Sequence, residues 1–356
     1  MDKKSITFIF HQPSLLPVGG FKIVYEYANR LAKDGYEVHL VYAMMLGKDC
    51  GLKSAFIRLA RFMLAKISKH YSGKNWFDLD SRIKEHYVTT LKFQNVPKTD
   101  VYVATAVETA PYVSNYSRDK NNKLYLIQDF EEWNVSQTEV LTSYHLDLIL
   151  IVVSNWLQAI VRKEGLTSYL VPNGFDFKYF FLKNDIATRI STKIVMLYHY
   201  DHRKGLSYGF AALDIVKEKF PSLHVTLFGT PERPSDLPEW YEYYQKPDKE
   251  THNRIYNEAA IFVGTSLKEG WGLTIGEAMQ CGCAIVCTNN DGYKEMAIDG
   301  ENALLCDIKD AKALANNIIK LITDDELRIR LAKNGHDHIQ QFDIEKSYNK
   351  FKKIVE

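Results

Sequence analysis

The sequence has few features of a membrane-spanning, secreted or nucleic-acid-binding protein. No apolar run approaches the roughly 20 residues that span a membrane, and the start, Met1 to Lys4 followed by a short apolar run, lacks a signal-peptide pattern. The formal net charge is only +1, which argues against a protein that binds nucleic acid through its surface charge. We therefore expect a cytoplasmic protein without a nucleic-acid partner.

Cysteine is scarce, and its spacing suits neither disulfides nor zinc. The five cysteines are odd in number, which fits reduced thiols. Cys281, Cys283 and Cys287 lie close together, but Cys-x-Cys-x3-Cys without a nearby histidine is a poor zinc-binding pattern. We expect these thiols to be small buried side chains around a strand.

The chain also lacks G-x-G-x-x-G, the fingerprint of Rossmann sites for nicotinamide and flavin cofactors. Five segments of the first half nevertheless have the composition of buried strands: 5–10, 36–43, 101–104, 123–128 and 148–153. Helical patterns lie between them, and Ser154 is expected to cap the helix after the last strand. This alternation predicts a doubly wound α/β domain.

A second α/β repeat follows Pro172-Asn-Gly-Phe-Asp176, where Pro and Asn-Gly mark a boundary. Its expected strands are 193–198, 225–228, 260–263, 284–287 and 303–306. Helices are expected at 206–219, 311–323 and 325–338, with a last one from Asp343. Because 356 residues exceed what one core usually supports, we expect two domains.

The most informative stretch is Glu269-Gly-Trp-Gly-Leu-Thr-Ile-Gly-Glu277, which lies between a predicted strand and a predicted helix. Gly270 and Gly272 let the backbone approach a ligand closely, and the first helical turn points unpaired N–H groups toward the same place. Such a turn suits a phosphate. Glu269 and Glu277 would instead accept hydrogen bonds from hydroxyl groups.

The run from Ser266 to Met279, with seven residues between its glutamates, resembles the E-x7-E signature of the retaining GT-B glycosyltransferases, glycosyltransferase family 4 in particular. The interleaved Gly-Trp-Gly and the trailing Glu-Ala-Met make the match specific. The resemblance implies two Rossmann-like βαβ domains that face a central cleft. Residues 1–172 would form the acceptor-side domain and 173–339 the nucleotide-sugar-binding domain, with a C-terminal helix, 340–356, crossing back to the first.

The activity that this resemblance implies is a transfer without cofactor or metal. A hexose or 6-deoxyhexose would move from a nucleotide-diphosphate sugar to a saccharide or lipid-linked acceptor in cell-surface polysaccharide synthesis, with retention of configuration. Arg203, Lys204 and the helix start at Gly272 to Thr274 would replace a divalent metal at the diphosphate. Glu277 would hold the ribose and Glu269 the ring hydroxyls of the donor sugar.

The resemblance also implies the remaining site residues. The expected catalytic residues are Glu269, Gln128 and Asp129. The expected nucleotide-sugar-binding residues are Gly19, Gly20, His199, Arg203, Lys204, Gly229, Gly270, Trp271, Gly272, Leu273, Thr274 and Glu277.

Two positions depart from the family pattern. His199 stands where relatives usually carry an arginine five residues before the lysine, so it is either a neutral donor to phosphate or a satisfied loop histidine. Gln128 replaces a histidine that contacts the donor sugar near its C6 hydroxyl. Gln128-Asp-Phe-Glu131 resembles a subgroup linked to rhamnosyl transfer, and the alternative is that Gln128 and Asp129 cap the following turn.

Residues 48–74 form a basic segment with helical apolar spacing. Its basic residues are Lys48, Lys53, Arg58, Arg61, Lys66, Lys69 and Lys74, with only Asp49 opposing them. Its apolar residues are Leu52, Phe56, Leu59, Met63 and Ile67. Such a helix suits anionic lipid at the inner face of the cell membrane, and membrane-associated family members use a similar element to reach lipid-linked acceptors. The alternative is an amphipathic helix packed on its own domain.

Three rival interpretations stay open. Asp78-Leu79-Asp80 matches the Asp-x-Asp motif of metal-dependent GT-A transferases, although such a short motif carries little weight. A GT-B relative can also act as a nucleotide-sugar epimerase. A third possibility is a catalytically silent carbohydrate-binding partner of another transferase.

Overall fold

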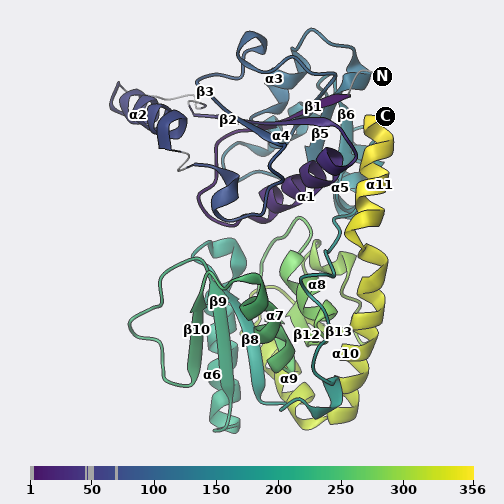
Figure 1. The fold of residues 1–356 in the computed structure, drawn as a ribbon. Helices are drawn as coiled ribbons and strands as arrows, with labels where there is room; N and C mark the ends of the chain where they lie inside the picture. The colour runs from purple at the N-terminus through teal and green to yellow at the C-terminus, as the bar shows by residue number, and fades with distance from the viewer. Residues whose placement is uncertain (1–3, 45, 47–51, 69–70) are drawn as a thin grey trace. The chain divides into compact units, whose positions relative to one another are not determined.

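The computed structural model describes residues 4–44, 46, 52–68 and 71–356 (Figure 1). Contacts within the chain divide it into two compact units, each built on a parallel sheet. Unit 1 comprises Met1–Asn173 and Glu345–Glu356, and unit 2 comprises Gly174–Ile344. The chain therefore leaves unit 1 at 173/174 and returns to it at 344/345.

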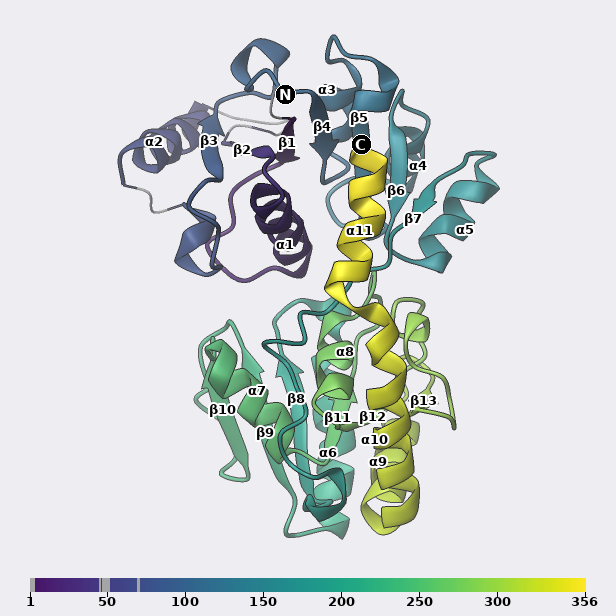
Figure 2. The same cartoon turned by 45° about the vertical axis from the view of Figure 1, so that its right-hand side comes forward.

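Unit 1 holds a seven-stranded sheet in the order β3-β2-β1-β4-β5-β6-β7 (Figure 2). Its strands are β1 Ser5–Phe10, β2 Glu37–Ala43, β3 Lys84–Val88, β4 Val101–Ala104, β5 Lys123–Ile127, β6 Ile149–Val152 and β7 Tyr169–Leu170. Its helices are α1 Gly19–Lys33, α2 Leu52–Ser68, α3 Ala110–Ser114, α4 Gln137–Tyr144, α5 Asn155–Lys163 and α11 Ile344–Val355. The strand order reverses between β1 and β4, as in doubly wound sheets.

The last helix, α11, packs on the first strand of unit 1 beside α1. The ring of Phe351 stacks on Phe8 of β1 and on Tyr27 of α1, with centroids 6.0 and 4.8 Å apart. At the surface, the hydroxyl of Tyr348 donates to Asp34 at 2.6 Å. The C-terminal segment is therefore an integral part of the unit 1 core.

Unit 2 holds a six-stranded sheet in the order β10-β9-β8-β11-β12-β13. Its strands are β8 Lys193–Tyr198, β9 His224–Gly229, β10 Tyr241–Gln245, β11 Ile261–Gly264, β12 Ala284–Thr288 and β13 Ala303–Cys306. Its helices are α6 Leu206–Lys219, α7 Lys249–Glu258, α8 Leu273–Gln280, α9 Ala311–Thr323 and α10 Asp325–Ile339. Here the strand order reverses between β8 and β11.

The ten strands predicted from sequence all form, with ends within one residue of the prediction. They form because a parallel sheet covered on both faces needs continuous apolar runs, and all four residues of β4 and of β11 are buried. The prediction missed β3, β7 and β10. Each is an edge strand, and half-exposed edges carry polar residues that hide the apolar signal.

The expected cap of α5 needs correction, and the two alternatives for residues 48–74 can be compared with the exposure of α2. Ser154 occupies the position before α5, but its hydroxyl makes no capping hydrogen bond. The apolar stripe predicted for α2 is exposed at Phe56, Met63 and Ile67, which are 73, 51 and 77% exposed. Of the basic segment, residues 48, 49 and 69 lie outside the described residues, as do the side chains of Leu52, Lys53, Arg58 and Lys66.

No helix in the described ranges is both long enough and apolar enough to cross a membrane.

A buried arginine fastens the start of unit 2 to its sheet. The guanidinium of Arg189 donates to the carbonyls of Asn184, Ala259 and Cys281 at 3.1, 2.9 and 2.6 Å. These carbonyls lie in the linker, before β11 and after α8. Arg189 therefore ties the linker to the segments that carry the candidate site, and a lone arginine in an irregular stretch gave no sequence signal for this role.

Candidate functional site

The expected residues of unit 2 gather where three neighbouring strands end. In a parallel sheet the carboxyl ends share one edge, so the loops after β8, β11 and β12 meet there. The loops comprise residues 199–205, 265–272 and 289–295. The edge includes the reversal point between β8 and β11, where open α/β sheets place their ligands.

The turn before α8 leaves the start of that helix open. Gly272 has φ +98°, in the left-handed region, and no side chain caps the first turn of α8. A Cβ at Gly272 would lie 2.6 Å from the Tyr293 ring, so glycine is required for packing as well as for conformation. The first-turn N–H groups, which include those of Leu273 and Thr274, suit an anion at this end of α8.

Glu269 forms an ion pair with Lys204, which the sequence placed in a separate loop. The Lys204 Nζ lies 2.7 Å from Glu269 Oε1, and the Ser266 hydroxyl donates to the same oxygen at 2.6 Å. The two charged side chains are 26 and 14% exposed. Both hydrogen bonds that the described residues donate to this carboxylate reach Oε1.

A network that the sequence did not reveal holds Ser266 in place. The Tyr293 hydroxyl donates to Ser266 Oγ at 3.1 Å, and Asn290 Nδ2 donates to the Ser266 carbonyl at 3.0 Å. Asn290 Oδ1 also accepts the Tyr293 backbone N–H at 3.0 Å. Burial raises the pKa of the Tyr293 phenol far above its ordinary value, so the tyrosine is a neutral donor. The loop after β12 thus supports Glu269 through Ser266.

Arg203 is committed to a carboxylate two residues earlier. Its Nε and Nη2 donate to Asp201 Oδ2 at 3.0 and 2.5 Å. These bonds lower the pKa of the Asp201 carboxyl to about 2. Arg203, the predicted phosphate cation, therefore has its own counter-ion, and the sequence did not reveal this role of Asp201.

His199 is neutral in this arrangement. Its Nδ1 accepts the Asp201 backbone N–H at 3.0 Å, which places the ring proton on Nε2. Burial, followed by the charge of Lys204, lowers the pKa of His199. Both interpretations of His199 are compatible with this geometry, because Nδ1 satisfies the loop while Nε2–H can still donate to a ligand.

The other expected residues of unit 2 lie deeper. Glu277 is 5% exposed, and the Tyr256 hydroxyl donates to its Oε2 at 3.4 Å. Trp271 is 3% exposed and packs edge-on against Phe342, so its side chain anchors the turn and only its backbone can face a ligand. Gly229 ends β9, and Gly270 lies in the turn between Glu269 and Trp271.

Four expected residues belong to unit 1 and meet at the carboxyl edge of its sheet. Gly19 and Gly20 open α1. Gln128, directly after β5, donates from Nε2 to the Gly20 carbonyl at 3.1 Å, and its Oε1 is buried with no partner among the described residues. Asp129 Oδ1 accepts the Phe130 N–H at 2.8 Å. Gln128 thus holds the start of α1 by a hydrogen bond, and Asp129 caps the turn that follows β5.

An acidic residue of the same edge has a strongly altered pKa. Glu131 accepts the Val107 N–H at 2.5 Å, and burial raises the pKa of its carboxyl to about 8. The nearby carboxylates of Glu108 and Asp129 contribute to this rise in pKa, and the hydrogen bond from Val107 opposes it. The altered pKa of Glu131 was not predictable from the sequence, because burial of a carboxyl is a property of the fold.

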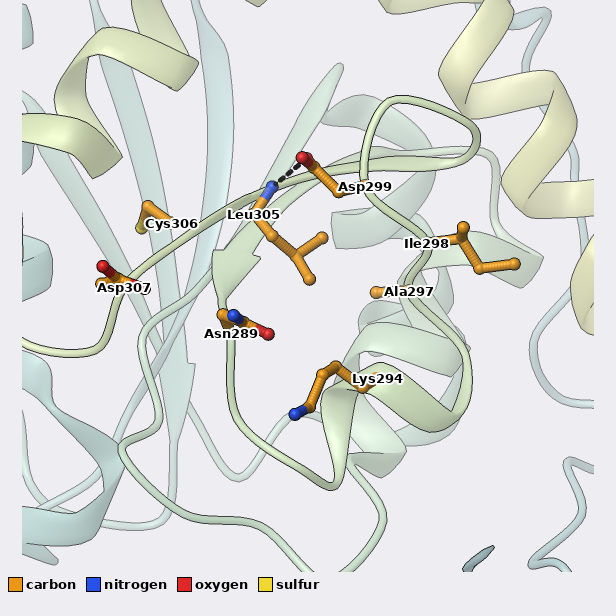
Figure 3. A pocket seen from close by; sticks show the side chains of 8 residues that line it. All are labelled: Asn289, Lys294, Ala297, Ile298, Asp299, Leu305, Cys306 and Asp307. Carbon is orange, nitrogen blue, oxygen red and sulfur yellow. Dashed lines mark hydrogen bonds between the residues drawn. The ribbon is translucent and has the colours of Figure 1, made fainter. Parts of the chain in front are cut away.

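A shallow hollow lies in unit 2, at the ends of β12 and β13 (Figure 3). Its volume is 610 Å³, and its lining includes Asn289, Lys294, Asp299 and Asp307. None of the expected site residues lines it.

The structure also shows the environments of the Asp78-Leu79-Asp80 motif and of the clustered cysteines. The Asp80 carboxylate binds Arg82 at 2.6 Å, and this arginine lowers the pKa of Asp80 to about 2. Within the described ranges, no group of three or more His, Cys, Asp or Glu side chains is arranged to hold a metal. Cys281, Cys283 and Cys287 are buried thiols around β12, as expected.

Comparison with known proteins places this geometry in a family context. Residues 189–338 match the sequence model of the family Glycosyl transferases group 1. The chain is 26% identical over 216 residues to phosphatidyl-myo-inositol mannosyltransferase of Mycolicibacterium smegmatis, covering 57% of this chain and 56% of that protein. It is 39% identical over 83 residues to N,N'-diacetylbacillosaminyl-diphospho-undecaprenol alpha-1,3-N-acetylgalactosaminyltransferase of Campylobacter jejuni, covering 23 and 22%. The chain thus spans about half of the first relative and less of the second.

The fold extends the likeness to the whole chain. HepE of Anabaena, solved in complex with UDP and glucose, superimposes with a TM-score of 0.73 at 17% identity over 99% of both chains. Two Rossmann-like domains with this topology define the GT-B class of folds. The segment that matches the family model, residues 189–338, lies within unit 2.

Proposed function

We propose that this protein is a retaining glycosyltransferase that needs no metal. It moves a hexose or 6-deoxyhexose from a nucleotide-diphosphate sugar to a saccharide or lipid-linked acceptor in cell-surface polysaccharide synthesis. The observation that carries the proposal is the convergence of Lys204, Glu269 and the open start of α8 at one sheet edge. The family match of residues 189–338 supports the same reaction.

Each group has a role that follows from its chemistry. Lys204 and the first-turn N–H groups of α8 stabilise negative charge on the departing diphosphate. Glu269 accepts hydrogen bonds from sugar hydroxyls and stabilises the positive charge that grows on the sugar. The acceptor oxygen bonds to the anomeric carbon on the face that the diphosphate leaves, and its proton passes to the leaving phosphate oxygen. Glu277 holds the ribose.

Donor turnover in a chelator tests the proposal. The full chain is incubated in EDTA with uridine, guanosine and thymidine diphosphate sugars, first ranked by thermal shift because a bound donor raises stability. Slow release of nucleoside diphosphate and free sugar is expected. An isomerised sugar would favour an epimerase, and no conversion would favour a silent binding partner. Activity that is lost in EDTA and restored by manganese would revive the Asp78–Asp80 alternative.

The donor sugar is proposed to be a 6-deoxyhexose, with rhamnose as the first candidate. Gln128 stands where family members carry a histidine that contacts the donor C6 hydroxyl, and one of its amide N–H groups already binds the Gly20 carbonyl. A C6 hydroxyl without a partner is desolvated at a cost. We expect kcat/KM for a nucleotide-linked 6-deoxyhexose to exceed that for the matching hexose by about tenfold or more, the usual range for a missing hydrogen bond. Equal values, or a preference for the hexose, would remove rhamnose and leave the transferase proposal intact.

The acceptor is proposed to be lipid-linked, with α2 as the membrane contact. Phe56, Met63 and Ile67 are exposed along this helix, together with the cation of Arg61. The two sequence relatives carry names that include phosphatidyl-inositol and diphospho-undecaprenol groups. Exposed apolar area and basic charge together favour binding to anionic lipid.

Vesicle sedimentation measures this contact. Replacing Phe56, Met63 and Ile67 with serine should lower binding to vesicles rich in phosphatidylglycerol by about tenfold or more, because each large apolar side chain contributes about 1.5–3 kcal/mol on burial. Ile190→Ser, at a 59% exposed position of unit 2, is the matched control and should leave binding unchanged. Undiminished binding of the triple variant would exclude α2 as the contact.

A further inference from the structure

The four charged groups at the proposed phosphate site cancel one another. Lys204 pairs with Glu269 and Arg203 pairs with Asp201, while His199 is neutral. A site with two cations and two carboxylates has no net positive charge to attract a diphosphate. A diphosphate that binds to either cation must therefore displace the carboxylate that now holds it.

The geometry of the two ion pairs indicates which of them is more easily broken. Asp201 holds Arg203 through two side-chain nitrogens and also accepts the Arg203 backbone N–H at 2.9 Å, so this pair is local and multiply bonded. Lys204 makes a single side-chain contact, through a flexible stem, to a residue 65 positions away. A point charge on a flexible stem changes partner more easily than a guanidinium fork.

We propose that Lys204 exchanges Glu269 for the donor diphosphate, and that Ser266 and Tyr293 then hold Glu269 in place for the sugar. This inference rests on the proposed function and adds the order of events within its site. Before binding, Lys204 neutralises Glu269. After binding, Lys204 neutralises the diphosphate, and Glu269 Oε1 is open to a sugar hydroxyl.

The position of the Glu269 carboxylate does not depend on Lys204 alone. Ser266 Oγ still donates to Oε1, and Tyr293 still donates to Ser266. The Gly292 backbone approaches the Glu269 carbonyl so closely that a Cβ there would lie 2.3 Å from the carbonyl oxygen, so the two loops are in tight contact. The carboxylate therefore stays where it is while the lysine moves, which makes Ser266 and Tyr293 positioning residues.

The exchange predicts that a substitution in the binding site increases the affinity for an anion. If Glu269 competes with the anion for Lys204, then removing its charge should tighten the binding of an anion that has no sugar. Inorganic pyrophosphate is the probe, measured by isothermal titration calorimetry without metal. Glu269→Gln is expected to bind it about tenfold more tightly than the unsubstituted protein, equivalent to about 1.4 kcal/mol, and Lys204→Ala should abolish the gain in the double variant.

A matched control separates this competition from a general change in charge. Glu258→Gln breaks an ion pair with Arg254 at the end of α7 and changes the net charge equally. It should leave pyrophosphate affinity within twofold of the unsubstituted protein. Equal gains in both variants would assign the effect to net charge and overturn the exchange.

A second experiment tests whether Tyr293 positions Glu269 through Ser266. Tyr293→Phe removes one hydroxyl and keeps the ring, so kcat should fall about tenfold while affinity for nucleoside diphosphate is unchanged. Tyr241→Phe, which removes a buried hydroxyl without a described partner in the same unit, should change neither. A Tyr293→Phe variant that weakens nucleotide affinity and keeps kcat would overturn the positioning role.

The outcomes separate the exchange from the proposed function. If no variant binds pyrophosphate or nucleoside diphosphate, both are wrong. If the unsubstituted protein binds them and Glu269→Gln binds pyrophosphate equally or more weakly, the exchange is wrong and the transferase proposal stands. Glutamine is isosteric with glutamate, so Glu269→Gln should fold like the parent protein. A melting temperature within a few degrees of the parent checks this.

Discussion

Glu269→Gln is expected to lower kcat for sugar transfer by about 10²-fold or more, with no loss of nucleotide affinity. The carboxylate lies at the turn before α8, fixed by Ser266, where it would meet the sugar and not the nucleotide. As the glycosidic bond breaks, positive charge grows on the sugar, and a carboxylate stabilises that charge more than an amide does. Removing one preorganised group of this kind typically costs about 10²–10³ in rate.

Steady-state kinetics with the preferred donor check this result, and the KM for the donor and the affinity for nucleoside diphosphate are measured in parallel. Glu258→Gln is the control, because it removes an exposed carboxylate at the end of α7, and its kcat should equal that of the parent. A Glu269→Gln variant with full kcat would exclude a role for this carboxylate in the transition state. A variant whose only defect is a raised KM would assign Glu269 to ground-state binding.

The central strands and the site turn were predictable because their signals are local. Continuous apolar runs mark strands buried on both faces, and Gly272 before an apolar helix marks the open turn. The edge strand β10, with its sequence Tyr-Glu-Tyr-Tyr-Gln, has no such run and was missed.

The partners of the site residues were not predictable, because they come from distant loops. Lys204 and Glu269 were assigned separate ligands, and only the fold shows that they pair across 65 residues. Tyr293 supports Ser266 from 27 residues away. Asp201 was two residues from Arg203 and could have been recognised, since carboxylates that close to an arginine often bind it.

Gln128 illustrates the same limit in the other unit. The sequence offered two roles, a sugar contact or a cap for the following turn. The structure gives its amide nitrogen a third partner, the Gly20 carbonyl at the start of α1, 108 residues away. Spacing along the chain carries no information about such a contact.

Gly205 is the position at which the smallest substitution is expected to damage both stability and binding. It joins the turn of Arg203 and Lys204 to α6, with φ +62°. A Cβ at this position would lie 2.1 Å from the Thr265 carbonyl oxygen, a backbone atom that cannot rotate away. The turn is also hydrogen-bonded to the loop after β11, because Thr265 Oγ1 donates to the Lys204 carbonyl at 2.6 Å.

Gly205→Ala should therefore lower the melting temperature of unit 2 by roughly 5–15 °C and abolish pyrophosphate binding. A left-handed conformation costs alanine about 1–2 kcal/mol, and overpacking adds about 1–3 kcal/mol. For a domain of this size, each kcal/mol corresponds to about 2–4 °C. Relief of the clash must separate the two loops, which moves Lys204 away from Glu269 and from the start of α8.

Gly300→Ala isolates the steric part of this effect. Gly300 is also left-handed, with φ +72°, but a Cβ there would have nothing within 4 Å. The free energy of unfolding of this control should fall only by the cost of a left-handed alanine, about 1–2 kcal/mol. Its affinity for pyrophosphate should be unchanged. Scanning calorimetry and titration of both variants give the comparison. Equal losses of stability would show that the contact with Thr265 relaxes freely, and retained pyrophosphate binding in Gly205→Ala would separate the Lys204 turn from the anion site.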